Sequence, residues 1–185
     1  MQDDHAGPVS GVPPVWIESP GERFAVVRSF GKSLGPDLRV AAVCADERTI
    51  DRVAVSVSNG PGWVSHLMQR AVAHLLTDDT ATQQVAAAAV TYAERRRRLI
   101  AALAARGVAS HARSGLNVWI PTGDEQAAVD AARAAGFAIR GADSYRIASP
   151  PAVRVTISTL DDDRIDRLAT ALGRHLGAPR RSPAM

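Results

Sequence analysis

Short apolar runs alternate with polar and glycine-rich segments in the first part of the chain. Residues 24–27 (FAVV) and 38–43 (LRVAAV) have the length and composition of buried strands, and the intervening KSLGPD is typical of a turn. Residues 1–22 are rich in proline, glycine and acidic residues without a clear period, which predicts irregular structure. This part is therefore expected to form a strand, a functional loop and a second strand.

Helical periodicity dominates the middle of the chain. Within residues 58–78, apolar side chains recur at helical spacing, namely Trp63, Leu67, Val72, Leu75 and Leu76. Ser58 or Asn59 is the expected N-cap of this helix. A longer helix is predicted from about residue 82 to residue 105, ending at Gly107, with the arginine run 95–98 on its exposed side.

The last third of the chain alternates strand and helix patterns. The expected order is strand 116–120, helix 124–135 stopped by Gly136, strand 137–139, turn 140–144, strand 153–157 and helix 161–176. Thr159 or Asp161 is the expected cap of the last helix, because acidic residues follow in its first turn. The pattern predicts a compact α+β unit with an antiparallel sheet, followed by a frayed tail after Gly177.

Composition narrows the class of protein. A chain of 185 residues with 46% hydrophobic and 22% charged residues is typical of a soluble globular protein of one domain or two small ones. The net charge of +3 is spread over the chain, and the run 95–98 is too local to predict direct nucleic-acid binding. Cys44 is the only cysteine, so neither an intrachain disulfide nor a zinc site is expected. Without a signal-like N-terminus or an apolar run of roughly 18 residues, a cytoplasmic protein with no membrane contact is expected.

Lys32 is the only lysine among 22 basic side chains. A lysine amine can lose its proton and attack a carbonyl, which arginine cannot do, although a lone lysine in a glycine-rich loop is also an ordinary surface residue. The GKS at 31–33 does not complete a phosphate-binding loop, because the leading glycine of that motif would fall at Val26. Alternatively, the Ser29 hydroxyl and the Arg39 guanidinium suit a phosphate monoester, and Lys32 between them suits an aldehyde. A molecule with both groups is pyridoxal phosphate.

The segment SFGKSLGPDLR resembles the pyridoxal-lysine segment of fold-type I aminotransferases. It is most similar to the MocR-type members of the GntR regulators, whose pattern is close to S-F-S-K-x-L-x-P-x-L-R. The resemblance implies that Lys32 binds the cofactor covalently and that Ser29 and Arg39 bind its phosphate. Gly31 replaces the usual second serine, which removes one hydroxyl contact.

Two further segments carry the same resemblance. DDHAGPVSG is similar to the EDDY segment, which implies that Asp3 pairs with the pyridine nitrogen and that His5, where tyrosine is commoner, reaches the ring oxygen. SGLNVWIP resembles the strand GGLHLWV, and residues 150–172 resemble the family's PALRLSFANLDEEQIEEGVRRLAEAL ending. By this resemblance Arg154 clamps the substrate's α-carboxylate through two parallel hydrogen bonds.

The resemblance implies an α/β fold that corresponds to the C-terminal part of a longer protein. Residues 1–81 would be a remnant of the large cofactor-binding domain, 82–106 a linking helix, 107–178 a small α+β domain and 179–185 a tail. Such proteins normally also contain further strands, a loop that completes the phosphate site and an aromatic that stacks on the ring. MocR-type members add a DNA-binding winged helix. The few strands of the large sheet should therefore have exposed apolar flanks.

Three functional hypotheses follow from the resemblance. The first is a pyridoxal-phosphate-dependent aminotransferase-like protein acting on amino acids and 2-oxo acids, with weak or no activity as this chain alone. The alternative is the effector domain of a MocR/GntR-type regulator, sensing the cofactor or an amino acid without its DNA-binding domain. The third is a non-functional remnant. Because fold-type I active sites are usually shared across a dimer, the parent protein is expected to be a homodimer.

Overall fold

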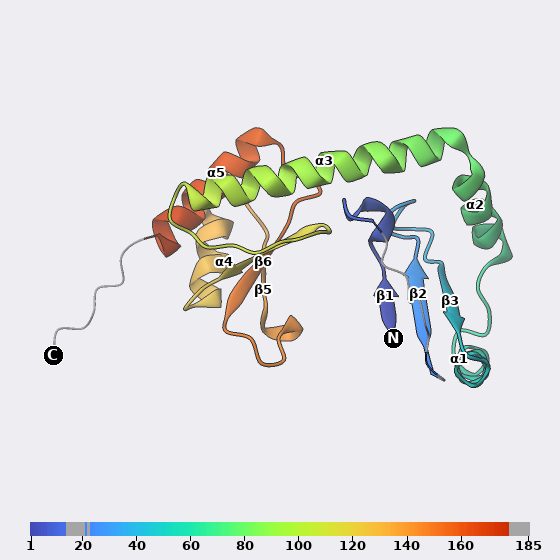
Figure 1. Cartoon of the computed structure of the whole chain (residues 1–185). Coiled ribbons are helices and arrows are strands. Elements are labelled where there is room, and N and C mark those ends of the chain that lie inside the picture. Colours follow the sequence, from blue (N-terminus) through green and yellow to red (C-terminus); the bar gives the residue numbers. More distant parts are fainter. Residues whose placement is uncertain (14–20, 22, 178–185) are drawn as a thin grey trace. The chain divides into compact units, whose positions relative to one another are not determined.

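The computed structural model contains both helices and strands and describes residues 1–13, 21 and 23–177 (Figure 1). The elements are β1 (Gln2–Asp4), a 3-10 helix (Gly7–Val9), β2 (Ala25–Ser29), β3 (Ala41–Ala45), α1 (Glu47–Asn59), α2 (His66–Thr77), α3 (Asp79–Ala104), β4 (Asn117–Pro121), α4 (Glu125–Ala134), β5 (Arg140–Gly141), a 3-10 helix (Asp143–Tyr145), β6 (Ala152–Thr156) and α5 (Asp162–Leu176). The chain divides into two compact units, Met1–Val90 and Thr91–Met185. The predicted tail lies outside the described residues.

The first unit contains a three-stranded sheet in the order β1-β2-β3. β1 runs parallel to β2, and β2 runs antiparallel to β3. The predicted strand, loop and strand are thus present, although the second strand begins at Ala41 and not at residue 38. The prediction of irregular structure throughout residues 1–22 was wrong, because residues 2–4 form β1. Their backbone pairs with a strand more than twenty positions away, which local composition does not encode.

Two helices of the first unit differ from the sequence prediction. α1 was not predicted, and Ser58 and Asn59 lie at its end, not at the start of the next helix. Ser65 is instead the N-cap of α2, where its hydroxyl accepts a hydrogen bond from the Met68 amide at 3.4 Å. Trp63 lies in the preceding loop and is 76% exposed. The glycines and proline of residues 59–62 (NGPG) separate α1 from α2. The prediction that a helix starts in this stretch was therefore wrong.

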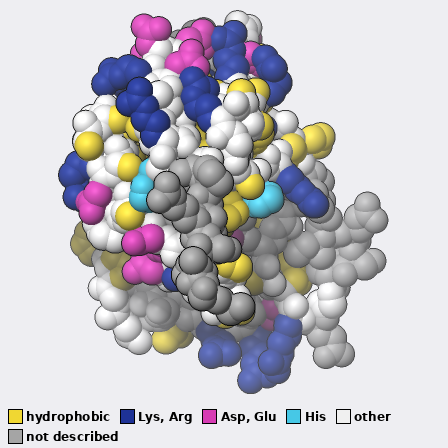
Figure 2. All heavy atoms as spheres, turned by 90° about the vertical axis from the view of Figure 1, so that its left-hand side faces the viewer, with side chains coloured by type: hydrophobic (Ala, Val, Ile, Leu, Met, Phe, Trp, Pro, Cys, Tyr) yellow, Lys and Arg dark blue, Asp and Glu magenta, His cyan; other side chains and the backbone are white. Residues whose placement is uncertain are grey.

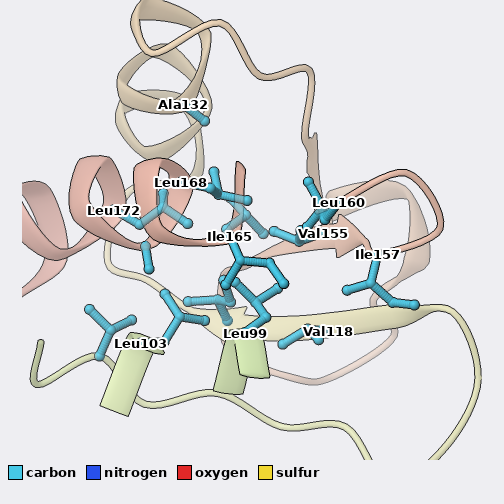
Figure 3. Packing of buried hydrophobic residues seen from close by; sticks show 14 of the residues in the cluster. Leu99, Leu103, Val118, Ala132, Val155, Ile157, Leu160, Ile165, Leu168 and Leu172 are labelled. Carbon is cyan, nitrogen blue, oxygen red and sulfur yellow. The ribbon is translucent and has the colours of Figure 1, made fainter. Parts of the chain in front are cut away.

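The second unit has an antiparallel sheet in the order β4-β6-β5. Its core collects side chains from α3, α4, α5 and the sheet, among them Leu99, Ala132, Val118, Val155 and Leu168 (Figure 3). The two longer strands and the two C-terminal helices of the sequence analysis are confirmed within one residue at each end, and their caps are Asp124 and Asp161. The strand predicted at 137–139 was wrong: pairing with β6 is limited to residues 140–141.

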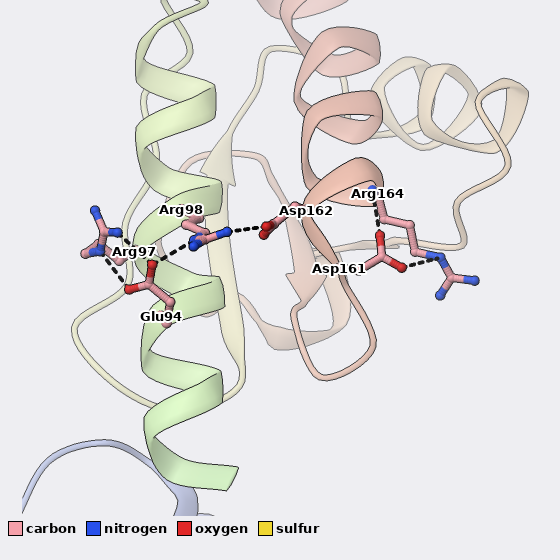
Figure 4. Close-up of polar contacts among 6 residues, drawn as sticks. All are labelled: Glu94, Arg97, Arg98, Asp161, Asp162 and Arg164. Carbon is pink, nitrogen blue, oxygen red and sulfur yellow. Dashed lines mark hydrogen bonds and ion pairs between the residues drawn. The ribbon is translucent and has the colours of Figure 1, made fainter. Parts of the chain in front are cut away.

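The arginine run on α3 is only partly solvated. Arg97 and Arg98 are exposed and pair with Glu94, and Arg98 also pairs with Asp162 (Figure 4). Arg96, however, is 7% exposed and donates a hydrogen bond to the Gly115 carbonyl at 2.9 Å. Four consecutive helical residues span the whole circumference, so one of them must face inward. Basic and acidic side chains lie interspersed along the upper part of the surface in Figure 2.

Candidate functional site

The loop between β2 and β3 carries Lys32. At its base the Phe30 amide donates to the Val40 carbonyl at 3.1 Å, and inside the loop the Leu34 amide donates to the Phe30 carbonyl at 2.9 Å. Phe30 and Val40 are buried and pack with Val72 of α2. These contacts fix both ends of the loop, while the Lys32 side chain is exposed.

Three of the predicted residues lie on one face of the first sheet. Asp3 is in register with Val27, and Ser29 follows Val27 by two residues on the same strand. Because strand side chains alternate between faces, Asp3 and Ser29 project from the same face. His5 follows Asp3, and its Nδ1 lies 3.5 Å from Asp3 Oδ1. The fold thus gathers a carboxylate, an imidazole and a hydroxyl on the face next to the lysine loop.

The neighbouring Asp4 has a structural role on the opposite face. Its Oδ2 accepts a hydrogen bond from Arg28 Nε at 2.8 Å and forms an ion pair with Arg28 Nη2 at 2.7 Å. A Cβ atom at Gly7 would lie 2.0 Å from Asp4 Oδ1, so a side chain at this position would displace the Asp4 carboxylate. Of the two adjacent aspartates, only Asp3 remains available to a ligand on the face with Ser29.

Arg39 and Gly31 shape the two sides of the loop. Arg39 has a φ of 48°, in the left-handed region that L-residues other than glycine rarely adopt. At Gly31 an added Cβ would lie 3.9 Å from Ser29 Oγ and 3.7 Å from the Gly35 carbonyl, which are ordinary contact distances. The space would therefore accept the serine of the related pattern.

These groups fit the chemistry of pyridoxal phosphate. Among the described residues, the Ser29 hydroxyl, the Lys32 amine and the Arg39 guanidinium make no hydrogen bond or ion pair. A hydroxyl and a guanidinium suit a phosphate, an amine suits an aldehyde, and the Asp3 carboxylate suits a pyridinium nitrogen. Within the described part of the chain, no group of three or more histidine, cysteine or acidic side chains could hold a metal ion.

Arg154 lies in the second unit, on β6. It is in register with Trp119 of β4 on one side and with Arg140 of β5 on the other. Its Cζ atom lies 4.1 Å from the centre of the Tyr145 ring, and its Nη2 donates to the Tyr145 hydroxyl at 3.2 Å. Tyr145 and Arg140 were not predicted as site residues, because only the strand register and the 143–145 turn bring them to Arg154.

The matched region of the chain decides its family. The family model for aminotransferase class I and II matches residues 5–172, which include Ser29, Lys32, Arg39 and Arg154, whereas Asp3 precedes the match. The chain belongs to the aminotransferase class I and II family. Members of this family depend on pyridoxal phosphate in general.

None of the helices in the described ranges has the length and hydropathy that a bilayer crossing requires.

A curated relative and several solved structures are similar to this family member. The chain is 34% identical over 178 residues to the vitamin B6 salvage pathway transcriptional repressor PtsJ of Salmonella typhimurium, covering 94% of this chain and 41% of the repressor. Aspartate aminotransferase of Thermus thermophilus (tetra mutant 1) has a TM-score of 0.80 at 20% identity, covering 94% of this chain and 50% of that one. Multiple substrate aminotransferase of Thermococcus profundus has a TM-score of 0.82 at 16% identity, with coverages of 94% and 46%.

These likenesses support the fold over nearly the whole chain. They also show that the chain spans about half the length of the aminotransferase structures and 41% of the repressor. The α/β fold expected from the sequence, which corresponds to part of an aminotransferase, is therefore confirmed.

Proposed function

We propose that the first unit binds pyridoxal phosphate through Lys32. The observation that carries this proposal is the group of Ser29, Lys32 and Arg39 side chains around one hairpin loop, none of which has a hydrogen-bond or ion-pair partner among the described residues. The sheet face next to this loop carries Asp3 and His5. Membership of the aminotransferase class I and II family supports the same ligand.

Each residue has a definite task in this proposal. The Lys32 amine would hold the cofactor at its aldehyde carbon, and it is the group that would move the proton at the substrate's Cα. Ser29 Oγ and the Arg39 guanidinium donate to the phosphate. Asp3 accepts from the ring nitrogen, and His5 hydrogen-bonds the ring oxygen. When bound, the cofactor supplies an electron sink. Arg154 pairs with the α-carboxylate of the amino or 2-oxo acid.

The first candidate function is transamination between amino acids and 2-oxo acids. We expect this chain alone to be weakly active or inactive, because it spans about half the length of the aminotransferases it matches. In the same proposal, residues 1–81 form part of the cofactor-binding domain, 82–106 the linking helix and 107–178 the small domain. The parent protein is a cytoplasmic homodimer.

The second candidate function is regulatory. It is favoured by the 34% identity to a transcriptional repressor of vitamin B6 salvage. In this version the same Lys32 site binds the cofactor or an amino acid as a signal, and the response belongs to a DNA-binding domain outside this chain. Cofactor binding without turnover is the expected behaviour.

Reductive trapping tests the Lys32 assignment. Lys32 is the only lysine, so treatment with pyridoxal phosphate and borohydride should label one internal peptide, residues 29–39 after digestion beside the arginines. Lys32→Arg keeps the positive charge but cannot hold the aldehyde, and it should lose the label. The N-terminal amine serves as an internal control because both proteins carry it. Absence of the internal label in the unchanged chain would overturn the proposal.

The same samples separate the two candidate functions. Release of a 2-oxo acid after an amino acid is added, dependent on Lys32, supports transamination. Labelling of Lys32 with no release supports the sensing role.

A further inference from the structure

The open face of the second sheet carries two neighbouring cations, Arg140 and Arg154. Arg140 of β5 and Arg154 of β6 are direct cross-strand partners. Like charges in this position destabilise a sheet, because their Cβ atoms are only about 5 Å apart. In the part of the chain that the structure describes, neither guanidinium forms an ion pair with a carboxylate. The fold thus maintains an electrostatically unfavourable pair.

Tyr145 joins the two arginines. Its hydroxyl oxygen accepts from Arg140 Nη1 and from Arg154 Nη2, both at 3.2 Å. These two bonds occupy the acceptor sites of the phenol oxygen and leave its own O–H free to donate. Arg154 Nε is buried and has no hydrogen-bond partner. The polar groups of these three side chains that are not used in these bonds are all hydrogen-bond donors. Two of the three side chains are positively charged.

We propose that Arg140, Tyr145 and Arg154 form one anion-binding site with a preference for dicarboxylates. The inference rests on the proposed function in one respect, that Arg154 binds the α-carboxylate of the substrate. Arg140 then supplies the second positive charge, and the Tyr145 hydroxyl donates to the ligand between them. A monocarboxylate neutralises only one guanidinium, whereas an amino or oxo acid with a second carboxylate neutralises both.

The packing of Arg154 supports this assignment. The Tyr145 ring covers one side of the guanidinium at 4.1 Å, which holds its plane by a cation–π contact. On the strand side away from Arg140, the cross-strand partner of Arg154 is Trp119 of β4. The guanidinium therefore has a restricted orientation, so less side-chain entropy is lost when it binds a planar carboxylate.

Titration of the full chain without cofactor tests the proposal. The probes are succinate and propionate at low ionic strength, followed through the arginine Nε–Hε signals of ¹⁵N-labelled protein. Succinate should bind about ten-fold more tightly than propionate, since one additional charge-assisted contact is made. Arg140→Gln should remove this difference and leave propionate binding within about two-fold. Tyr145→Phe keeps the ring and should weaken both ligands, because only the hydroxyl is lost.

Arg174→Gln is the matched control, since it removes the same charge from an exposed position on α5. It should leave both affinities unchanged, and circular dichroism should show that all variants are folded. Equal affinity for the two probes in the unchanged chain, or an equal loss in the Arg140 and Arg174 variants, would overturn the proposal. Because neither measurement involves pyridoxal phosphate, failed labelling of Lys32 with succinate binding intact would refute only the proposed cofactor role.

Discussion

Arg39 illustrates how a single residue can be placed against its own backbone preference. At a φ of 48° it adopts a left-handed conformation that costs an L-residue about 1–2 kcal/mol. Glycine would avoid this cost, yet the position holds an arginine whose guanidinium has no partner among the described residues. A strained residue with a free charged group at a loop end is typical of a ligand site.

Replacing Arg39 by glycine should therefore separate stability from binding. We expect Arg39→Gly to raise the free energy of unfolding by about 0.5–1 kcal/mol, since the relief of strain exceeds the added entropy of the unfolded chain. Urea denaturation measures this change. The yield of Lys32 labelling at limiting pyridoxal phosphate should fall several-fold. Arg39→Lys, which keeps the charge and the strain, is the control for stability. A clear loss of stability in the glycine variant would show that the guanidinium supports the fold.

Helices and strands with a local sequence signal could be predicted, whereas strands that depend on pairing with a distant segment could not. α4 and α5 have their own caps and periodicity, so the sequence predicted them nearly to the residue. β1 depends on its register with β2, and β5 is only two residues long, so neither has a usable local signal. The candidate site residues also differ in whether a local sequence signal reveals them. Ser29, Lys32 and Arg39 lie within one short stretch and were predictable, whereas Tyr145 reaches Arg154 only through the folded sheet.

A charge network links two of these elements, α3 and α5. Glu94 accepts from Arg97 Nη2 at 2.7 Å and from Arg98 Nε at 2.7 Å, and Arg98 also pairs with Asp162 in the first turn of α5 (Figure 4). Hydrogen bonds from Arg97 and then Arg98 lower the pKa of Glu94 to about 2. The pKa of Arg98 is raised, mainly by its bond to Asp162.

This network predicts a pH-dependent contribution to stability. Because the pKa of Glu94 is lower in the folded chain than its ordinary value of 4.5, its stabilisation is fully present above that value. It should disappear as the pH falls toward about 2. Glu94→Gln should therefore lower the thermal midpoint at pH 7, by a small amount because the pair is exposed. At the acid end of this range the thermal midpoints of the unchanged chain and of Glu94→Gln should coincide. A difference that stays constant with pH would show that Glu94 acts through packing and not through charge.

Across the whole molecule, buried apolar side chains are concentrated in one unit. The larger cluster includes Leu103, Ile120, Ile157 and Leu168 of the second unit, whereas the buried cluster of the first unit consists of Phe30, Val40 and Val72. α1 contains no buried residue, and its Ile50, Val53 and Val55 are exposed. In the sheet itself no residue of β2 or β3 is buried, and Ala41, Ala42 and Cys44 of β3 are exposed, which agrees with the exposed flanks expected for these strands. Since burial of apolar area is the main source of stability, the second unit should be the more stable one.

Hydrogen exchange on the full chain tests this difference between the units. Backbone amides in β4, β6 and α5 should exchange more slowly than those in β2 and β3, because opening the second unit exposes the larger core. Leu168→Ala removes a fully buried side chain and should cost about 2–5 kcal/mol. Since Leu168 belongs to the second cluster alone, the loss of protection should appear in β4, β6 and α5 and leave β2 and β3 unchanged. Val72→Ala in α2 is the reciprocal variant, and it should lower protection only in the first unit. If either variant accelerated exchange equally in both sheets, the two units would unfold together and their separate cores would not set their stabilities.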